Sequence, residues 1–290
     1  MPIKRRLIKI ETPKGQPGFL GAGHTARPVI SGSFSESDPF IMLMDDMLDK
    51  KDNTPVGGPH PHAGFETVTF LLEGEIGDEA HKMKSGDFQM MTAGGGIVHT
   101  ETIDKISRMR LLQLWLNLPK KDRWTTPRVQ DLQSAHVPAL SENGVSIKLY
   151  SGSLAGLTSP VQNYTAIIVA DISIEAGTTT IQQIPANYNT FLYVIKGSVK
   201  VGEDGKQLKQ GQVGWLNLLK DTVQSDLVLT AAEEGVRFVL YAGKPTGENI
   251  VSYGPFIADS TEDIHRLYQD YRLGKMKHIS TVPESQRILL

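Results

Sequence analysis

The sequence has no cysteine among its 290 residues. Disulfide bonds and thiolate metal ligands are therefore excluded, and any metal site must be built from histidine and carboxylate side chains. The absence of disulfides fits a reducing compartment. We accordingly expect a cytoplasmic protein.

The sequence also lacks an excess of either charge, since 30 Lys and Arg stand against 32 Asp and Glu, for a formal net charge of −2. Such a balance gives no general attraction to nucleic acid or to anionic membranes. No apolar run approaches the roughly 20 residues of a membrane span, and the start has no signal-peptide core. We expect a soluble protein, monomeric by default, that binds neither nucleic acid nor membranes directly.

Long helical periodicity is nearly absent, whereas short apolar runs separated by Gly, Pro, Asn and Asp recur through most of the chain. This pattern predicts an all-β protein. The expected strands are residues 67–72, 87–92, 111–118, 165–172, 190–195 and 238–241. The exception is residues 260–274, where apolar side chains at helical spacing lie between a capping Ser260 and Gly274. They predict a short C-terminal helix.

An imperfect internal repeat indicates two domains. Residues 69–75 (TFLLEGE) resemble residues 192–198 (LYVIKGS), and each segment is a strand that enters a glycine turn. The stretch 119–138 is charged and poor in apolar residues, as expected of a connector. We therefore predict a metal-binding N-terminal domain, 1–130, and a C-terminal domain, 131–290.

The second domain cannot repeat a three-histidine site, because the sequence has no histidine between His136 and His265. One metal ion per chain is the expected maximum.

Two couplets, His60-Pro61-His62 and His99-Thr100-Glu101, place metal-ligating side chains two residues apart. Residues i and i+2 of a strand point to the same face, so each couplet directs its groups at one point. Three imidazoles and a carboxylate suit a transition metal better than calcium or magnesium. Alternation from His62 also reaches Glu66, so spacing alone does not choose between Glu66 and Glu101 as the carboxylate ligand.

The couplets lie within residues 58–75 (GPHPHAGFETVTFLLEGE) and 86–101 (GDFQMMTAGGGIVHTE), which closely resemble the signature of the pirin family in the cupin superfamily. The resemblance extends to residues 38–40, 113–119 and 252–256. It implies two stacked cupin (double-stranded β-helix, jelly-roll) barrels with a short C-terminal helix. It also implies a metal, Fe(II), held by the residues that match His60, His62, His99 and Glu101.

The pirin pattern favours Glu101 as the ligand and leaves Glu66 to orient a histidine. The same nitrogen and oxygen donors also accept Mn, Ni, Co or Zn. At the pocket rim the chain departs from the usual pirin pattern, with Ala63 in place of Arg and Met90 in place of Trp. These departures leave the ligands intact and affect the choice of substrate.

Some pirins are similar to quercetinases, which implies a quercetin 2,3-dioxygenase-like oxidoreductase with a small aromatic substrate and dioxygen as partners. Glu101 would then be catalytic, because a carboxylate beside the metal can take the proton of a substrate hydroxyl. The resemblance leaves an alternative, a non-enzymatic iron-dependent redox sensor that binds a transcription factor or another protein partner. In a third interpretation the metal is structural.

Further residues are candidates for the surroundings of the site. The expected apolar pocket walls are Phe40, Met42, Met44, Phe65, Met90 and Met91. His24 lies near the start of the barrel and could line its entrance, but we expect it in a surface loop. His81 could be a lid or substrate contact, but we expect it in a solvated turn.

Overall fold

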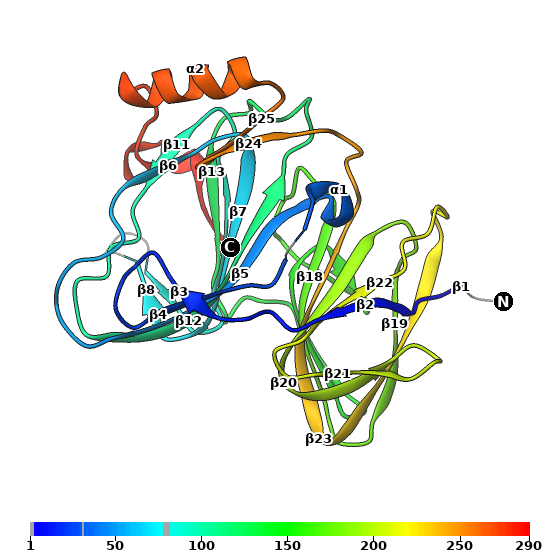
Figure 1. The fold of residues 1–290 in the computed structure, drawn as a ribbon. Coiled ribbons are helices and arrows are strands. Elements are labelled where there is room, and N and C mark those ends of the chain that lie inside the picture. The colour runs from blue at the N-terminus through cyan, green and yellow to red at the C-terminus, as the bar shows by residue number, and fades with distance from the viewer. Residues whose placement is uncertain (1–2, 31, 78–81) are drawn as a thin grey trace. The chain divides into compact units, whose positions relative to one another are not determined.

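The computed structural model describes residues 3–30, 32–77 and 82–290, and this part of the chain consists mainly of β-strands (Figure 1). The prediction of an all-β protein with a C-terminal helix is confirmed. The chain divides into two compact units. His81 lies outside the described residues.

One unit comprises Met1–Lys14 and Val137–Pro245. Because its sequence has no histidine, we call it the histidine-free unit. Its strands are β1 (Ile3–Lys4), β2 (Leu7–Glu11), β14 (Ala139–Glu142), β15 (Val145–Ser151), β16 (Ser153–Leu154), β17 (Leu157–Thr158), β18 (Ile167–Ile174), β19 (Thr179–Pro185), β20 (Asn189–Val201), β21 (Lys206–Lys209), β22 (Val213–Leu216) and β23 (Gln224–Gly243). The main sheet has the order β14-β15-β18-β23-β20-β22-β2 and encloses a core of Leu, Ile and Val.

The other unit, Gly15–His136 and Thr246–Leu290, is the histidine-containing unit. Its strands are β3 (Gln16–Pro17), β4 (His24–Pro28), β5 (Phe40–Lys50), β6 (His60–His62), β7 (Phe65–Glu73), β8 (Glu75–Ile76), β9 (Met83–Lys84), β10 (Phe88–Thr92), β11 (Ile97–His99), β12 (Ser107–Asn117), β13 (Arg128–Leu132), β24 (Val251–Tyr253), β25 (Phe256–Ala258) and β26 (Arg287–Leu289). Its helices are α1 (Phe34–Ser37), α2 (Thr261–Arg272) and the 3-10 helices η1 (Ile279–Thr281) and η2 (Glu284–Gln286). The main sheet has the order β26-β13-β10-β7-β12-β5-β4-β3, and β6 and β11 form a separate two-stranded sheet.

The two units differ from the predicted division at 130/131 because each end of the chain pairs with a sequence-distant strand. Leu7 of β2 pairs with Leu216 of β22, so the first residues join the histidine-free unit. At the other end, β26 pairs in parallel with β13. The stretch 119–138, predicted as a connector, thus contains a strand of the main sheet.

The predicted repeat corresponds to strands in equivalent positions. Strand β7 lies between β10 and β12, and β20 lies between β22 and β23. Gly74 and Gly197 both have positive φ, and an added Cβ would lie 2.3 Å from the carbonyl oxygen of Arg108 and 2.0 Å from that of Gly235, respectively. Only glycine fits such turns without a clash.

Helix α2 begins and ends as predicted. The Ser260 hydroxyl accepts a hydrogen bond from the backbone N–H of Asp263, and Gly274 has a φ of 67°. Ile264 and Leu267 are buried against a cluster that includes Phe256. None of the helices among the described residues combines the length and apolar character that crossing a membrane requires.

Three neighbouring strands of the histidine-containing unit, β4, β5 and β12, form the floor of a cavity. Strand β5 pairs with β12, which places Met42 opposite Trp115, Met44 opposite Gln113 and Asp46 opposite Leu111. On the other edge of β5, β4 places Ala26 opposite Asp46. Because side chains alternate along a strand, residues two apart on β5 and β12 share the cavity face.

Candidate metal centre

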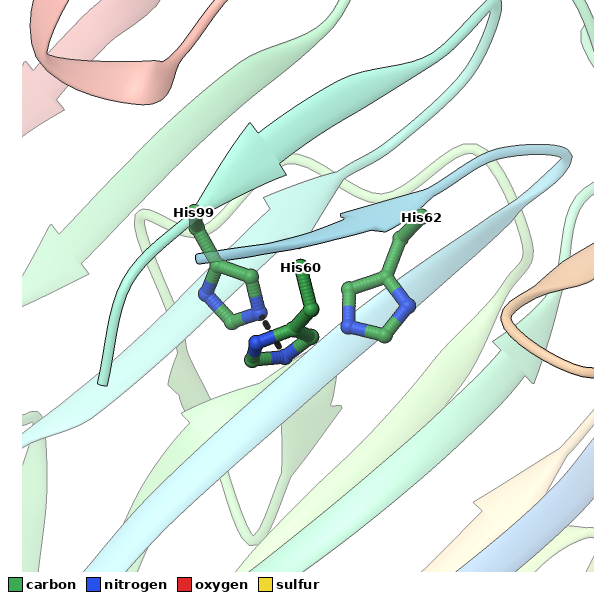
Figure 2. Close-up of side chains that lie close together, drawn as sticks. All are labelled: His60, His62 and His99. Atoms are coloured by element: carbon green, nitrogen blue, oxygen red, sulfur yellow. Dashed lines mark hydrogen bonds between the residues drawn. The ribbon is translucent and has the colours of Figure 1, made fainter. Parts of the chain in front are cut away.

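The histidines of the two couplets meet through the pairing of β6 with β11. In this antiparallel pair His60 lies opposite His99, and His62 lies opposite Ile97. The three imidazole rings converge on one region, as Figure 2 shows. One ring nitrogen from each lies within 4.8 Å of the others, which is close enough for a single metal ion to reach all three.

Hydrogen bonds fix the orientation of His60 in this cluster. His60 Nδ1 lies 2.9 Å from the Gly58 carbonyl oxygen, which can only accept, so Nδ1 carries the proton. The unprotonated Nε2 then faces His99 Nε2 at 2.8 Å (Figure 2). A backbone carbonyl that orients the second ring nitrogen is a common feature of metal-ligating histidines.

The two other histidines are held in the neutral state that binds metals. Burial lowers the pKa of His62 to about 3, and the nearby His60 adds to this effect. Burial also lowers the pKa of His99 well below its usual value, with His62 and His60 as further causes. Two buried, neutral imidazoles whose ring nitrogens converge with that of His60 fit a transition-metal ion.

The two candidate carboxylates have different surroundings. Glu66 is fully buried, accepts a hydrogen bond from the Thr92 hydroxyl at 2.7 Å, and does not line the cavity at the histidines. Glu101 follows β11, is partly buried, and lines this cavity together with the three histidines. Among the described residues, however, the tight cluster contains histidines alone. Coordination by Glu101 therefore stays a prediction.

The electrostatics of Glu101 suit a proton acceptor. Burial raises the pKa of its carboxyl group, and the negative charge of Asp46 adds to this rise, whereas His60 opposes it. A carboxylate with a raised pKa is a stronger base than an exposed glutamate.

The histidines open into a cavity of about 680 Å³, a size typical of small-molecule sites. Most of its wall is apolar, and it includes Met42, Met44, Met109 and Leu111. The indole of Trp115 packs edge-on against His62 with ring centroids 5.4 Å apart. Of the six predicted wall residues, Met42 and Met44 line the cavity. The other four, Phe40, Phe65, Met90 and Met91, are buried in the barrel and do not line it.

His24 does not lie in a surface loop, so that prediction is wrong. Its side chain is fully buried, its Nε2 lies 2.9 Å from Asp46 Oδ1, and both residues line the cavity. The pairing of β4 with β5 brings His24 and Asp46 together, and no local sequence pattern predicts that pairing. Alternation along β5 could have indicated Asp46, because Asp46 follows Met42 and Met44 at steps of two.

A buried arginine, which the sequence analysis did not identify, holds the turn after the first couplet. The Arg123 guanidinium donates to the Gly64 carbonyl at 2.9 Å, to Asn117 Oδ1 at 3.0 Å and to Asp259 Oδ1 at 2.9 Å. Its side chain is fully buried. Arg123 therefore fixes the backbone directly after β6, the strand that carries His60 and His62.

Comparisons with known proteins agree with this geometry. Residues 24–116 match the family model described as Pirin, and residues 169–277 match the Pirin C-terminal cupin domain, which confirms the predicted cupin fold. Pirin from Rattus norvegicus is 36% identical over 266 residues, with 88% of each chain covered.

Two solved structures extend the comparison. Quercetin 2,3-dioxygenase from Acinetobacter baumannii is 25% identical, with a TM-score of 0.82 over 95% of this chain and 99% of that one. GK1651 from Geobacillus kaustophilus is 33% identical, with a TM-score of 0.76 over 86% of this chain and 100% of that one.

Proposed function

This chain belongs to the pirin family, and we propose that it is a metal-dependent dioxygenase that acts on quercetin or a related flavonol or phenolic compound. One observation carries the proposal: three histidine nitrogens within 4.8 Å of one another face a largely apolar cavity of about 680 Å³. Such a cavity accepts an aromatic ligand and brings it to the histidines. The similarity to a solved quercetin 2,3-dioxygenase supports the substrate class.

We propose Fe(II) as the metal ion, with His60, His62, His99 and Glu101 as its ligands. When bound, such an ion supplies a Lewis acid for a substrate hydroxyl and a redox partner for dioxygen. The absence of cysteine leaves nitrogen and oxygen donors alone for this task.

Glu101 acts as the general base in this proposal. Its raised pKa favours transfer of the substrate's hydroxyl proton to a carboxylate oxygen. The deprotonated ring is electron-rich and reacts with dioxygen. Meanwhile Met42, Met44 and Trp115 pack against the aromatic rings and keep water from them.

The loss of quercetin's visible absorbance tests this function. Purified protein should consume quercetin under air, and neither protein under nitrogen nor protein stripped of metal should do so. A protein with one metal ion bound that leaves quercetin unchanged under air would contradict the proposal. That result would favour the protein-binding redox sensor instead.

A further inference from the structure

A second polar group faces the cavity apart from the histidine cluster. Asp46 and His24 line the cavity, and they are joined by the 2.9 Å contact between His24 Nε2 and Asp46 Oδ1. Neither residue is needed to hold a metal at His60, His62 and His99. A carboxylate in a largely apolar wall costs free energy unless its oxygens accept hydrogen bonds.

The hydrogen bonds of His24 determine how Asp46 is presented. His24 Nδ1 accepts the backbone N–H of Leu20 at 3.1 Å, so the ring proton lies on Nε2 and is donated to Asp46 Oδ1. Asp46 Oδ2 has no hydrogen bond to the described residues. Asp46 lines the cavity with a side chain that is 13% exposed, and we infer that this oxygen is available to a ligand there.

The neighbouring Asp45 differs from Asp46 in the partners of its carboxylate. Its side chain is fully buried, and its oxygens accept from Arg27 and Arg110. Asp45 is therefore neutralised within the protein, and it does not line the cavity. Alternation along β5 directs Asp46 to the opposite face, where its partner is a histidine and no arginine or lysine is present.

The charge of the cavity restricts the chemistry of its ligand. Among the described lining residues there is no lysine or arginine, whereas two carboxyl groups, Asp46 and Glu101, are present. A ligand carboxylate at the Asp46 end of the cavity would meet a second carboxylate with no lysine or arginine beside it among the described lining residues, which is unfavourable in a site of low polarity. A hydroxyl group, in contrast, can donate to the Asp46 carboxylate.

Asp46 and Trp115 lie at different positions along the floor of the cavity. Trp115, which contacts His62, lies opposite Met42, and Asp46 is four residues further along β5. At about 3.3 Å per residue, this step covers about 13 Å. The floor is thus long enough for an aromatic compound of two or more rings.

We propose that Asp46, oriented by His24, accepts a hydrogen bond from a second hydroxyl of the substrate, distinct from the hydroxyl directed at the metal centre. The cavity thereby favours aromatic compounds with a second hydroxyl and disfavours those that place a carboxylate at Asp46. This inference rests on the proposed function, since it concerns the ligand of the same cavity.

Dissociation constants measured under nitrogen, where no turnover occurs, test the inference on the protein as purified. Quercetin carries several hydroxyls, whereas 3-hydroxyflavone carries only the one proposed to be directed at the metal centre. Wild-type protein should bind quercetin at least about tenfold more tightly than it binds 3-hydroxyflavone, because a hydrogen bond to a charged acceptor contributes about this much. In Asp46→Asn an amide N–H₂ faces the hydroxyl donor. The dissociation constant for 3-hydroxyflavone divided by that for quercetin should therefore fall to a value between about 1 and 2. Binding of 4′-carboxy-3-hydroxyflavone should be weakest in wild type and improve in the variant.

The matched control is Asp49→Asn. Asp49 lies on the same strand as Asp46, and its exposed carboxylate forms an ion pair with Lys51. This substitution should leave the ligand ratio unchanged. An Asp46→Asn protein that keeps the wild-type ratio would overturn the inference. Because these constants are measured without oxygen, a protein that fails to consume quercetin can still satisfy the test, and an active dioxygenase can still fail it.

His24 is a positioning residue in this account, and two substitutions separate that role from a structural one. Glutamine can keep a donor near the position of Nε2, whereas asparagine can replace only the acceptor Nδ1 that receives the Leu20 N–H. His24→Gln should therefore retain most of the quercetin preference, and His24→Asn should lose it. Equal losses for both ligands in both variants would indicate a structural role and contradict the proposed positioning.

Discussion

The Nε2 atoms of His60 and His99 lie 2.8 Å apart although the two residues are 39 positions apart in the sequence. They face each other because β6 and β11 pair with these two residues directly opposite. Strand β6 contributes His60 and His62 to the site, and β11 contributes His99. Loss of either His60 or His99 therefore removes one of the three converging ring nitrogens.

The first prediction concerns metal occupancy. His60→Ala and His99→Ala should each bind much less metal than wild type, because each change removes one of three converging nitrogens. Metal per chain is measured by mass spectrometry after dialysis. His136→Ala removes an exposed histidine and should keep the wild-type value. Full occupancy in both cluster variants would refute the assigned site.

The second prediction separates the two carboxylates. Glu101→Gln should lower metal affinity and abolish quercetin consumption, because it removes the proposed ligand and base. Glu66→Gln should retain the metal, since Glu66 is bonded to Thr92 and does not line the cavity. Titration with Fe(II) under nitrogen compares the two variants. A larger loss of affinity in Glu66→Gln would reverse the assignment.

The histidine couplets could be predicted from sequence because their chemistry and their spacing are both local. Strand alternation alone places His60 and His62 on one face, and the structure pairs them with His99 as expected. Which of Glu66 and Glu101 lies beside the histidines could not be predicted from local spacing. It depends on the turn at Gly64, which ends β6 and begins β7 with Phe65.

Other features depend on which strands become neighbours, and a single sequence does not encode that in a readable pattern. His24 reaches Asp46 only because β4 pairs with β5, and the start of the chain joins the histidine-free unit only because β2 pairs with β22. Arg123 likewise contacts Gly64 across 59 positions. The six expected strands overlap β7, β10, β12, β18, β20 and β23, and the C-terminal helix was also predicted, because local periodicity sets these elements.

The third prediction is a pH dependence of the metal-free protein. The folded-state pKa of His62 is about 3, against 6.5 for an unperturbed histidine, so the unfolded chain binds protons first as the pH falls. The free energy of unfolding is therefore undiminished above pH 6.5 and decreases between pH 6.5 and 3. At pH 5 the loss from His62 alone is about 2 kcal/mol.

Urea unfolding at pH 7.5 and pH 5 measures this loss. His62→Asn should show a smaller difference between the two pH values, because its side chain does not titrate. His136→Gln, at an exposed position, should behave as wild type. Equal pH dependence in His62→Asn and wild type would show that His62 is not buried as described.

The fourth prediction concerns Arg123. Replacement by methionine leaves Asp259 and the Gly64 carbonyl without their buried donor, and the expected loss is about 3 kcal/mol in unfolding free energy. Urea denaturation measures it. Lys121→Met, two positions away and exposed, should change stability by less than about 0.5 kcal/mol. A difference below 1 kcal/mol between the two variants would mean that the Arg123 contacts contribute little.

Oxygen uptake tests the central claim most directly. Fe(II)-reconstituted protein with quercetin should consume one dioxygen per quercetin, and the metal-free protein and Glu101→Gln should consume none above background. The Asp49→Asn variant provides a control with an equal change in charge. No uptake by protein that demonstrably holds one iron per chain, or equal uptake by Glu101→Gln, would contradict the proposed dioxygenase.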